Sequence, residues 1–573
     1  MRRPATIFDR EVALARMAGE IFDVVVVGGG ITGAGVTLDA ASRGLRVALA
    51  ERGDFACGAS SKSSKMVHGG LRYLRQHEFG LVRESLRERR LLLQNAPHLV
   101  EPLAFLIPLF DKWAGVEQSY SAALWAYDLG GGRRIRKRHR RVGVEEVTAH
   151  FPTLRCDRLV AGFVYYDAWA DDARLTLSIL RTAVLDHGAV ALNYAPVVGF
   201  ARDGITGVTA VRIAPVAQPR SGCSQATPPE PSGAGGVLQV KAKVVVNATG
   251  AWGDDVQRLD DVSHRNSVRP AKGIHITVPR SKLPCDLAAL LPVPGDRRSI
   301  FVIPWDEHTY IGTTDTDYTG PLDDVRAEPE DITYLLDAVN SVVTSPLRPQ
   351  DVTACWAGLR PLLATTASRR RTPSARTADL SRRHKVETSA SGLISVTGGK
   401  LTTYRRMAAD TVDAVQRELG STIVRSRTEH LRLRGSERLK PSRTRELVAE
   451  IGLSEDVVEH LEGRFGSETA AVLGLCLARP ELSTKLAEGL LNIEAEVVYA
   501  ARFEMATCVD DVLARRIRTL ALDARSAAAA AARTAELLGA ELGWEDSWVR
   551  DEAKAFSELS ERGVEAVSGC SAN

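Results

Sequence analysis

The chain has 573 residues, 44% hydrophobic and 25% charged, a composition typical of a globular protein with room for two or three domains. Its formal net charge is only +3, so overall charge gives no reason to expect a nucleic-acid partner. No segment approaches the roughly 20 consecutive apolar residues of a membrane-spanning helix, and the N-terminal arginines are not followed by the apolar stretch of a secretory signal.

Two short strands and a helix near the N-terminus form the unit around which we expect the chain to be organised. Residues 23–27 are mostly β-branched, as in a buried parallel strand, and a helix is predicted over 34–42. A second strand follows over 46–50. With glycines between the first strand and the helix, this is the arrangement of a Rossmann-like α/β domain.

The glycines and the acid after the second strand have the spacing that a bound dinucleotide needs. Gly28 permits a tight turn, Gly30 lets backbone approach the phosphates, and Gly33 lets the helix pack closely on the strand. The helix N-terminus favours the pyrophosphate charge. Glu51, about 20 residues further on, is placed to bond a ribose and disfavours a 2′-phosphate, so we expect FAD or NAD. A glycine-rich turn in another kind of α/β unit is the alternative.

A polar loop follows the nucleotide unit. Residues 54–73 contain serines, two lysines, a histidine and a glycine pair, and little that could form a regular buried element. Such a segment suits a loop that clasps a polar ligand, and Ser60, Ser63 and Ser64 are its candidate cofactor contacts. A solvated surface loop is the alternative, although the apolar residues in this segment indicate that it enters the protein.

The next part of the chain carries a candidate membrane-docking surface. Helices are predicted over 78–94 and 118–129, a proline-broken apolar stretch lies at 102–113, and seven arginines and lysines occur within 133–141. An apolar stretch beside a basic run could dock on anionic lipid. A solvated basic loop is an equally good interpretation.

An insertion interrupts the remainder of the first domain. A helix over 171–188 and strand-like runs between 189 and 214 lead to residues 215–236, whose Pro, Gly and Ser content predicts a flexible extension. The strand 242–247 then ends in small residues, where Gly250 and Trp252 are candidate cofactor contacts because backbone can approach a nucleotide closely there.

Strand patterns over 268–315 predict an antiparallel sheet that is separate from the nucleotide unit. A later strand, 393–397, leads into a second glycine turn and helix start, with candidate cofactor contacts at Gly399, Lys400, Leu401 and Thr402. The expected domains are a nucleotide-binding domain at 20–75, 155–260 and 351–420, a substrate-binding domain at 76–154 and 261–350, the flexible insertion at 215–236, and an all-α domain at 430–560.

Ten motifs occur in order along the chain. They are GGGITGAG at 28–35, SSKMVHGGLRY at 63–73, YYDAWADDARL at 165–175, NATGAW at 247–252, KGIH at 272–275, FVIPW at 301–305, IGTTDTDY at 311–318, GLRPL at 358–362, LSRRH at 380–384 and GGKLTTYR at 398–405. In these motifs the chain resembles the FAD-dependent, respiratory glycerol-3-phosphate dehydrogenases. The resemblance runs from about residue 20 to 415, and more loosely through the helical part. It implies a fold of the glutathione-reductase or D-amino-acid-oxidase type with FAD as cofactor.

The resemblance also implies an activity and its partners. The expected reaction is oxidation of sn-glycerol 3-phosphate to dihydroxyacetone phosphate in glycerol catabolism, by hydride transfer to FAD, with electrons passed to a respiratory quinone. A homodimer associated peripherally with the cytoplasmic face of the plasma membrane is expected too. The implied substrate-pocket residues are Arg72, Tyr73, His275, Arg360, Arg382 and Lys400. For each arginine, a surface salt bridge is the alternative to phosphate binding.

His275 and His68 are the candidates to take the hydroxyl proton, because an unperturbed histidine titrates near neutrality. His275 alternates with Ile274 and Ile276 in a predicted strand, so its side chain should point away from two apolar neighbours. A core histidine satisfied by backbone is the alternative. We expect His275 to be the base and Arg360 or Lys400 to stabilise the developing alkoxide.

Other functions remain open from the sequence. A glycerol-3-phosphate oxidase that uses dioxygen shares the same motifs, an amine or hydroxy-acid oxidase shares the fold, and a non-catalytic flavoprotein would keep only the FAD site. The cysteines exclude zinc-finger chemistry, since they form no CxxC pair and lack a suitable histidine spacing. This scatter suits reduced thiols in a cytoplasmic protein with no metal site; the eight positions are 57, 156, 223, 285, 355, 476, 508 and 570.

Overall fold

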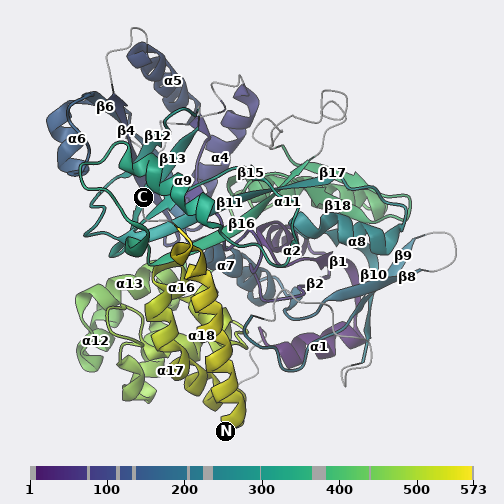
Figure 1. Cartoon of the computed structure of the whole chain (residues 1–573). Helices are drawn as coiled ribbons and strands as arrows, with labels where there is room; N and C mark the ends of the chain where they lie inside the picture. Colours follow the sequence, from purple (N-terminus) through teal and green to yellow (C-terminus); the bar gives the residue numbers. More distant parts are fainter. Residues whose placement is uncertain are drawn as a thin grey trace.

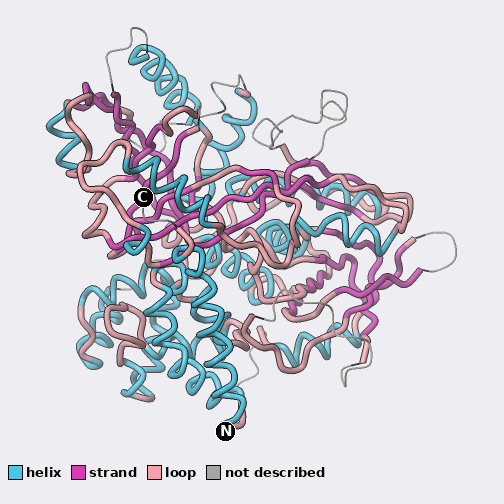
Figure 2. Tube along the Cα trace, in the orientation of Figure 1, coloured by secondary structure: helices cyan, strands magenta, loops and turns pink. Residues whose placement is uncertain are grey.

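The computed structural model describes residues 8–71, 73, 78–110, 116–131, 137–202, 207–222, 236–296, 298–363, 383–437 and 441–570. Two sheets and a group of C-terminal helices form three regions (Figure 1), and Figure 2 shows the helices of the third region gathered on one side of both sheets. The predicted fold class is confirmed: an α/β nucleotide-binding unit, a second sheet domain and an all-α C-terminal domain.

The first sheet is the nucleotide-binding one, and its central strands are parallel. Alternate residues of its central strand face two apolar cores. Val24 and Val26 pack with the helices on one face, and Val25 and Val27 pack with Met17 on the other. The strand order is β17 (Lys385–Thr388), β18 (Ile394–Thr397), β10 (Leu238–Asn247), β1 (Ile21–Val27), β2 (Val47–Ala50) and β7 (Val190–Leu192), with β9 (Val208–Ile213) on β10 and β8 (Val197–Arg202) on β9.

Helices cover both faces of this sheet, as a doubly wound fold requires. One face carries α2 (Ile31–Ser42), α7 (Asp172–Leu185) and α11 (Tyr404–Glu418). The other carries α1 (Arg10–Gly19), and α8 (Gly253–Asp260) lies near the outer strands. The helix predicted at 34–42 begins three residues earlier, since Gly30 is its N-cap.

The second sheet is larger than predicted and is mixed rather than purely antiparallel, because β12 and β4 pair in parallel. Its order is β15 (Thr316–Asp317), β11 (Val268–Pro279), β14 (His308–Gly312), β13 (Ser299–Trp305), β12 (Ala288–Pro292), β4 (Val100–Phe110), β6 (Leu159–Ala170) and β3 (Met66–Val67), with β16 (Ala354–Leu363) on β11 and β5 (Arg140–Val142) on β6.

Four of these strands correct the sequence-based assignment. The strands β3, β6 and β16 were placed in the nucleotide-binding domain, but they pair in the second sheet. The stretch 102–113 was predicted only as apolar and broken by prolines, but most of it is β4. Its prolines fit because Pro102 and Pro108 lie outside the two residues, Phe105 and Leu106, that pair with β12.

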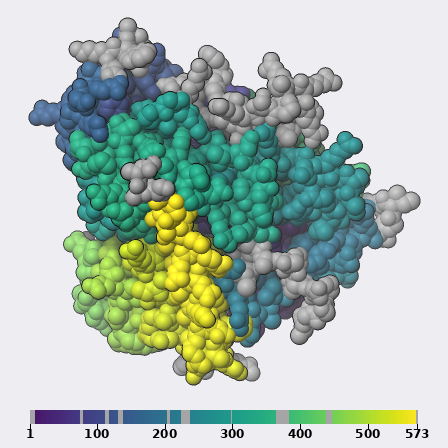
Figure 3. All heavy atoms as spheres, viewed as in Figure 1, coloured from purple at the N-terminus to yellow at the C-terminus, as the bar shows by residue number. Residues whose placement is uncertain are grey.

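The C-terminal region is helical, as predicted, and has its own apolar core. Its longer helices are α12 (Pro441–Ile451), α13 (Glu455–Phe465), α14 (Thr469–Ala478), α15 (Glu494–Phe503), α17 (Ala524–Leu542) and α18 (Asp546–Ser568), with a π-helix at Asp511–Arg516 and the short α16 (Thr519–Leu522). The space-filling view shows this region, green to yellow, packed against the teal residues of the second sheet domain (Figure 3). The other helices are α4 (Phe79–Asn95), α5 (Val116–Gly131), α6 (Val144–His150) and α9 (Pro329–Asn340). No helix of the described residues is long and apolar enough to cross a membrane.

The segment predicted to be flexible, 215–236, begins as packed structure. Ser221 is buried, and its backbone N–H donates to Glu552 of α18 at 3.0 Å. Its hydroxyl donates to the same carboxylate. Ser221 is therefore held by the helical domain, and 223–235 lie outside the described residues.

Candidate active site

The glycine turn after β1 has space for no side chain at two of its positions. Gly28 has φ +106°, and a Cβ there would lie 2.8 Å from the Ala248 carbonyl oxygen. A Cβ on Gly33 would lie 1.8 Å from the Gly28 carbonyl oxygen. Both positions therefore require glycine. A pyrophosphate-binding turn needs such positions, because its backbone must approach the phosphates closely.

The acid and the serine predicted beside this turn lie against it. Glu51 accepts hydrogen bonds from the backbone N–H groups of Gly29, at 2.5 Å, and Gly53, at 2.9 Å. The Ser60 hydroxyl accepts one from the Ile31 N–H at 2.8 Å, at the start of α2. The carboxylate is thus held in place by backbone, and its contact with a ribose remains a prediction.

His275 of β11 is at the centre of a second group. Ile274 and Ile276 enter the apolar core, and His275 lies on the opposite face of the sheet. Its ring stacks on Trp356 of β16, with 4.8 Å between ring centres and 9° between planes, and Nε2 is 2.8 Å from the Ser64 hydroxyl. Burial, and then the charges of Lys65 and Arg360, lower the pKa of His275 well below its ordinary value. The imidazole is therefore neutral at physiological pH, the protonation state that a proton acceptor needs.

Arg360 lies on the same face, because β11 and β16 pair with Gly273 opposite Gly358 and Ala271 opposite Arg360. A Cβ on Gly273 would lie 2.6 Å from the Arg360 guanidinium. The guanidinium donates to the Thr313 hydroxyl at 3.0 Å, the Thr314 carbonyl at 3.2 Å and the Asp315 carboxylate at 3.3 Å, so it is also part of an ion pair. Because Gly273 has no side chain, the Arg360 guanidinium has room on the face of the sheet that carries the His275 imidazole.

The remaining substrate candidates fall in other places. Lys400 lies at the end of β18 with Nζ 3.9 Å from the centre of the Tyr73 ring and 3.3 Å from the Ser85 hydroxyl. The His68 backbone N–H donates to the Thr402 hydroxyl at 3.2 Å, so His68 is near this second cluster. Arg72 and Arg382 lie outside the described residues.

The other cofactor candidates follow the ends of β10 and β18. Gly250 begins a short 3₁₀ turn that includes Trp252, whose indole N–H donates to Asp323 at 2.8 Å. Gly399 has φ +81°, and a Cβ there would lie 2.3 Å from the Met407 sulfur. Leu401 and Thr402 are in the 3₁₀ turn that opens α11. The Ser63 hydroxyl donates to Asp172 at 2.7 Å, so this hydroxyl is hydrogen-bonded within the protein.

Sequence reasoning missed two kinds of site residue. Lys65 lies inside the motif at 63–73, and Trp356 lies just before the motif at 358–362. Their positions in the sequence did not show that Trp356 stacks on His275 or that Lys65 contacts Trp356. The arginines of the helical domain that hold the loop at 54–65 were missed because their partners are more than 400 residues away in sequence.

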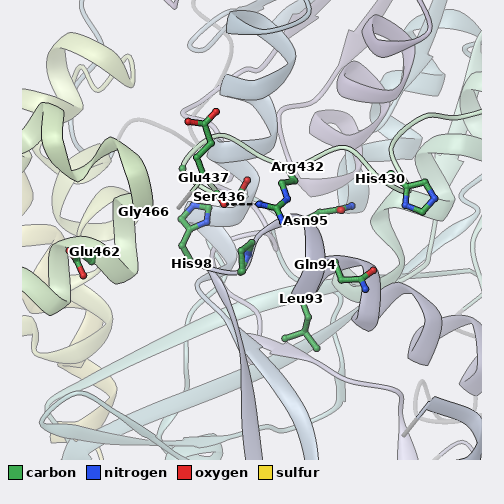
Figure 4. Close-up of a pocket in the computed structure, with 12 residues that line it drawn as sticks. Leu93, Gln94, Asn95, His98, His430, Arg432, Ser436, Glu437, Glu462 and Gly466 are labelled. Carbon is green, nitrogen blue, oxygen red and sulfur yellow. Dashed lines mark hydrogen bonds between the residues drawn. The ribbon is translucent and has the colours of Figure 1, made fainter. Parts of the chain in front are cut away.

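A pocket of about 760 Å³ lies between the end of α4, residues 430–437 and α13. Figure 4 shows the residues that line it. Arg432 donates to the Ser436 carbonyl there at 3.4 Å. Ser436 Oγ and His98 Nδ1 have no hydrogen-bond partner among the described residues, but neither atom exposes surface to the pocket. None of the predicted site residues lines this pocket, so it is not part of the candidate active site.

Comparison with known proteins agrees with this geometry. Residues 23–405 match the family described as FAD dependent oxidoreductase, and residues 426–548 match the C-terminal domain of alpha-glycerophosphate oxidase. Glycerol-3-phosphate dehydrogenase 2 of Mycobacterium bovis is 42% identical over 544 residues, which are 93% of this chain and 87% of that relative. The mitochondrial glycerol-3-phosphate dehydrogenase of Homo sapiens is 36% identical over 538 residues, 92% of this chain and 71% of that relative.

Solved structures give the same result. The X-ray structure of the glycerol-3-phosphate dehydrogenase from Bacillus halodurans, complexed with FAD, has a TM-score of 0.76 at 30% identity and covers 98% of both chains. L-alpha-glycerophosphate oxidase from Mycoplasma pneumoniae, also with FAD bound, has a TM-score of 0.53 at 16% identity over 72% of this chain and 99% of that one, a likeness of fold alone.

The chain is therefore an FAD-dependent oxidoreductase. FAD is its cofactor, and the turn at Gly28 and Gly33 fits the pyrophosphate because neither position has space for a side chain. Within that class, the chain belongs to the glycerol-3-phosphate dehydrogenase family.

We expect Gly30→Val to fold but to lose FAD. A Cβ at Gly30 meets only Ser60, whose hydroxyl oxygen would be 3.0 Å away, so the fold needs only a shift of a few tenths of an ångström in that side chain. The rest of the valine would occupy the space through which backbone approaches the pyrophosphate. The measurement is visible absorbance per mole of protein after desalting. Gly19→Val, at the end of α1 with no atom within 4 Å, is the control, and a fully yellow Gly30→Val protein would contradict the placement.

Proposed function

We propose that this protein oxidises sn-glycerol 3-phosphate to dihydroxyacetone phosphate. The observation that carries the proposal is the buried, neutral His275 with the Arg360 guanidinium on the same sheet face. A secondary alcohol beside a dianionic phosphate needs a proton acceptor and fixed positive charge. The names of the relatives, glycerol-3-phosphate dehydrogenases at 36–42% identity, support the same substrate.

The side chains have separate tasks in this proposal. FAD, when bound, supplies the hydride acceptor. His275 accepts the hydroxyl proton, and its low pKa keeps it unprotonated at neutral pH. Arg360 and Lys400 supply positive charge to the phosphate and to the alcohol oxygen as it loses its proton. Arg360 is already oriented by Thr313 and Thr314, so little freedom is lost when substrate binds.

The proposal includes a quinone as electron acceptor at an anionic membrane surface. Phe79, Trp125 and Leu129, on α4 and α5, are 59%, 49% and 84% exposed, and such apolar side chains suit a lipid interface. The described end of the basic run, residues 137–141, lies close along the chain, and residues 133–136 are outside the described part. Electron transfer to dioxygen is the second candidate, because residues 426–548 match a domain named for an oxidase.

The proposed reaction predicts that sn-glycerol 3-phosphate reduces the bound FAD without oxygen. The anaerobic yellow protein should lose its visible flavin absorbance on addition of this compound, and its enantiomer and glycerol are the controls. A holoenzyme that is reduced by dithionite but not by sn-glycerol 3-phosphate would rule the substrate out.

The same reduced protein distinguishes the electron acceptors. We expect a quinone in anionic vesicles to restore the flavin absorbance faster than the same quinone in neutral vesicles, and faster than dioxygen. Rapid reoxidation by dioxygen with stoichiometric peroxide would instead identify an oxidase, and equal rates in the two kinds of vesicle would remove the proposed membrane surface.

Arg360→Ala should retain FAD and raise KM for sn-glycerol 3-phosphate, with kcat/KM falling about 10- to 100-fold. This is the size of a charge-assisted hydrogen bond, about 1.5–3 kcal/mol. Steady-state kinetics with an artificial acceptor measure it. Arg280→Ala is the matched control, because Arg280 lies beyond the end of β11 and bonds the Asp306 carbonyl. Unchanged kinetics in Arg360→Ala would remove Arg360 from the site.

A further inference from the structure

Lys65 is a buried cation beside the proposed base. It has no exposed surface, and it follows Ser63 and Ser64 in the loop that leads to β3. Its φ is +55°, a left-handed backbone conformation that is uncommon for a lysine. Such a conformation is retained where the surroundings determine it, which is frequent at functional sites.

Three aromatic rings surround the ammonium group. Nζ lies 4.2 Å from the ring centre of Trp356, 5.1 Å from that of Trp305 and 5.8 Å from that of Tyr310. Among the described residues, its only hydrogen bond is a long one, 3.4 Å, to the Ser63 carbonyl. Cation–π contacts therefore replace the carboxylate partner that a buried lysine usually has.

The ammonium and the His275 imidazole share two of these neighbours. His275 stacks on Trp356, and its ring centre lies 6.2 Å from that of Tyr310. The charged groups that face His275 are Lys65 and Arg360. Those that face Lys65 are Asp172, Asp171 and Arg518, of which Asp172 is bonded to Ser63 and Arg518.

We propose that Lys65 is a positioning residue whose ammonium group, held against Trp356, keeps His275 unprotonated and available to the substrate hydroxyl. A positive charge next to an imidazole disfavours the imidazolium. Burial lowers the pKa of Lys65 to about 7, with Asp172 opposing. Lys65 is therefore charged in the acidic range, where His275 would otherwise take up a proton. This inference rests on the proposed role of His275 as base.

The test compares pH profiles of FAD reduction in the holoenzymes of wild type, Lys65→Met and Lys65→Arg. In Lys65→Met the acidic limb should move up by about 1 pH unit, because a neighbouring charge in a buried site shifts a pKa by roughly that amount. In Lys65→Arg the charge is kept, so the limb should stay at the wild-type position. The titration of the substrate phosphate is common to all three proteins and cancels in the comparison.

A second readout does not depend on activity. Below pH 7, Lys65 is charged in both the folded and the unfolded chain, so burial of the charge lowers the free energy of unfolding by its full amount. Between pH 7 and 10.5 the unfolded chain binds more protons at this site, and the stability of the wild type rises with pH. Lys65→Met should therefore melt above the wild type at pH 6, and the difference should narrow by pH 9.

The outcomes separate the inference from the proposed function. A wild type whose FAD is not reduced by sn-glycerol 3-phosphate refutes the proposed function, whereas the melting comparison still tests the buried charge. Coincident acidic limbs in wild type and Lys65→Met, at equal FAD content, overturn the inference. If Lys65→Met does not retain FAD, Lys65→Gln carries the same expectation and keeps a group that can bond Ser63.

Discussion

The active-site loop depends on buried ion pairs with the helical domain. Asp54 is fully buried and accepts hydrogen bonds from Arg515 at 2.6 Å and from Arg516 at 2.6 and 2.9 Å. Burial alone would raise the pKa of Asp54, but the two guanidinium groups hold it below its ordinary value. Arg518 donates to the Ser61 carbonyl at 2.7 Å and to Asp172 at 3.1 Å. An unpaired buried charge is very costly in free energy. The loop therefore keeps this conformation only while the helical domain is packed against it.

This constraint reaches the proposed base through a short series of contacts. Asp172, held by Arg518, accepts hydrogen bonds from the Ser63 N–H and hydroxyl at 2.9 and 2.7 Å. The next residue, Ser64, is in contact with His275, and its carbonyl accepts from the Tyr310 hydroxyl at 2.9 Å. The helical domain thus orients the loop side chains that adjoin the imidazole. It therefore supports the candidate active site although it contributes none of the predicted substrate contacts.

Local patterns were sufficient for much of the fold and for part of the site. Gly28 and Gly33 are dictated by a turn within one strand–helix unit, and the orientation of His275 follows from alternation along one strand. The pairing of β6 and β16 with the second sheet could not be derived, because it depends on partners distant in sequence. The same holds for Lys65, whose surroundings come from three different strands, and for the arginines at 515, 516 and 518. Whether each cofactor and substrate residue contacts its ligand stays a prediction, and Arg72 and Arg382 lie outside the described residues.

The most direct test of this dependence is amide hydrogen exchange over residues 54–65 in the holoenzymes of wild type and Arg518→Met. Loss of the guanidinium leaves Asp172 and the Ser61 carbonyl without their partner from the helical domain. We expect the loop amides, including that of Ser63, to exchange about tenfold faster or more, while α17 and α18 keep their protection. Arg525→Met, on the exposed face of α17, should leave both unchanged. Wild-type protection of the loop in Arg518→Met would contradict the dependence of the active centre on the helical domain.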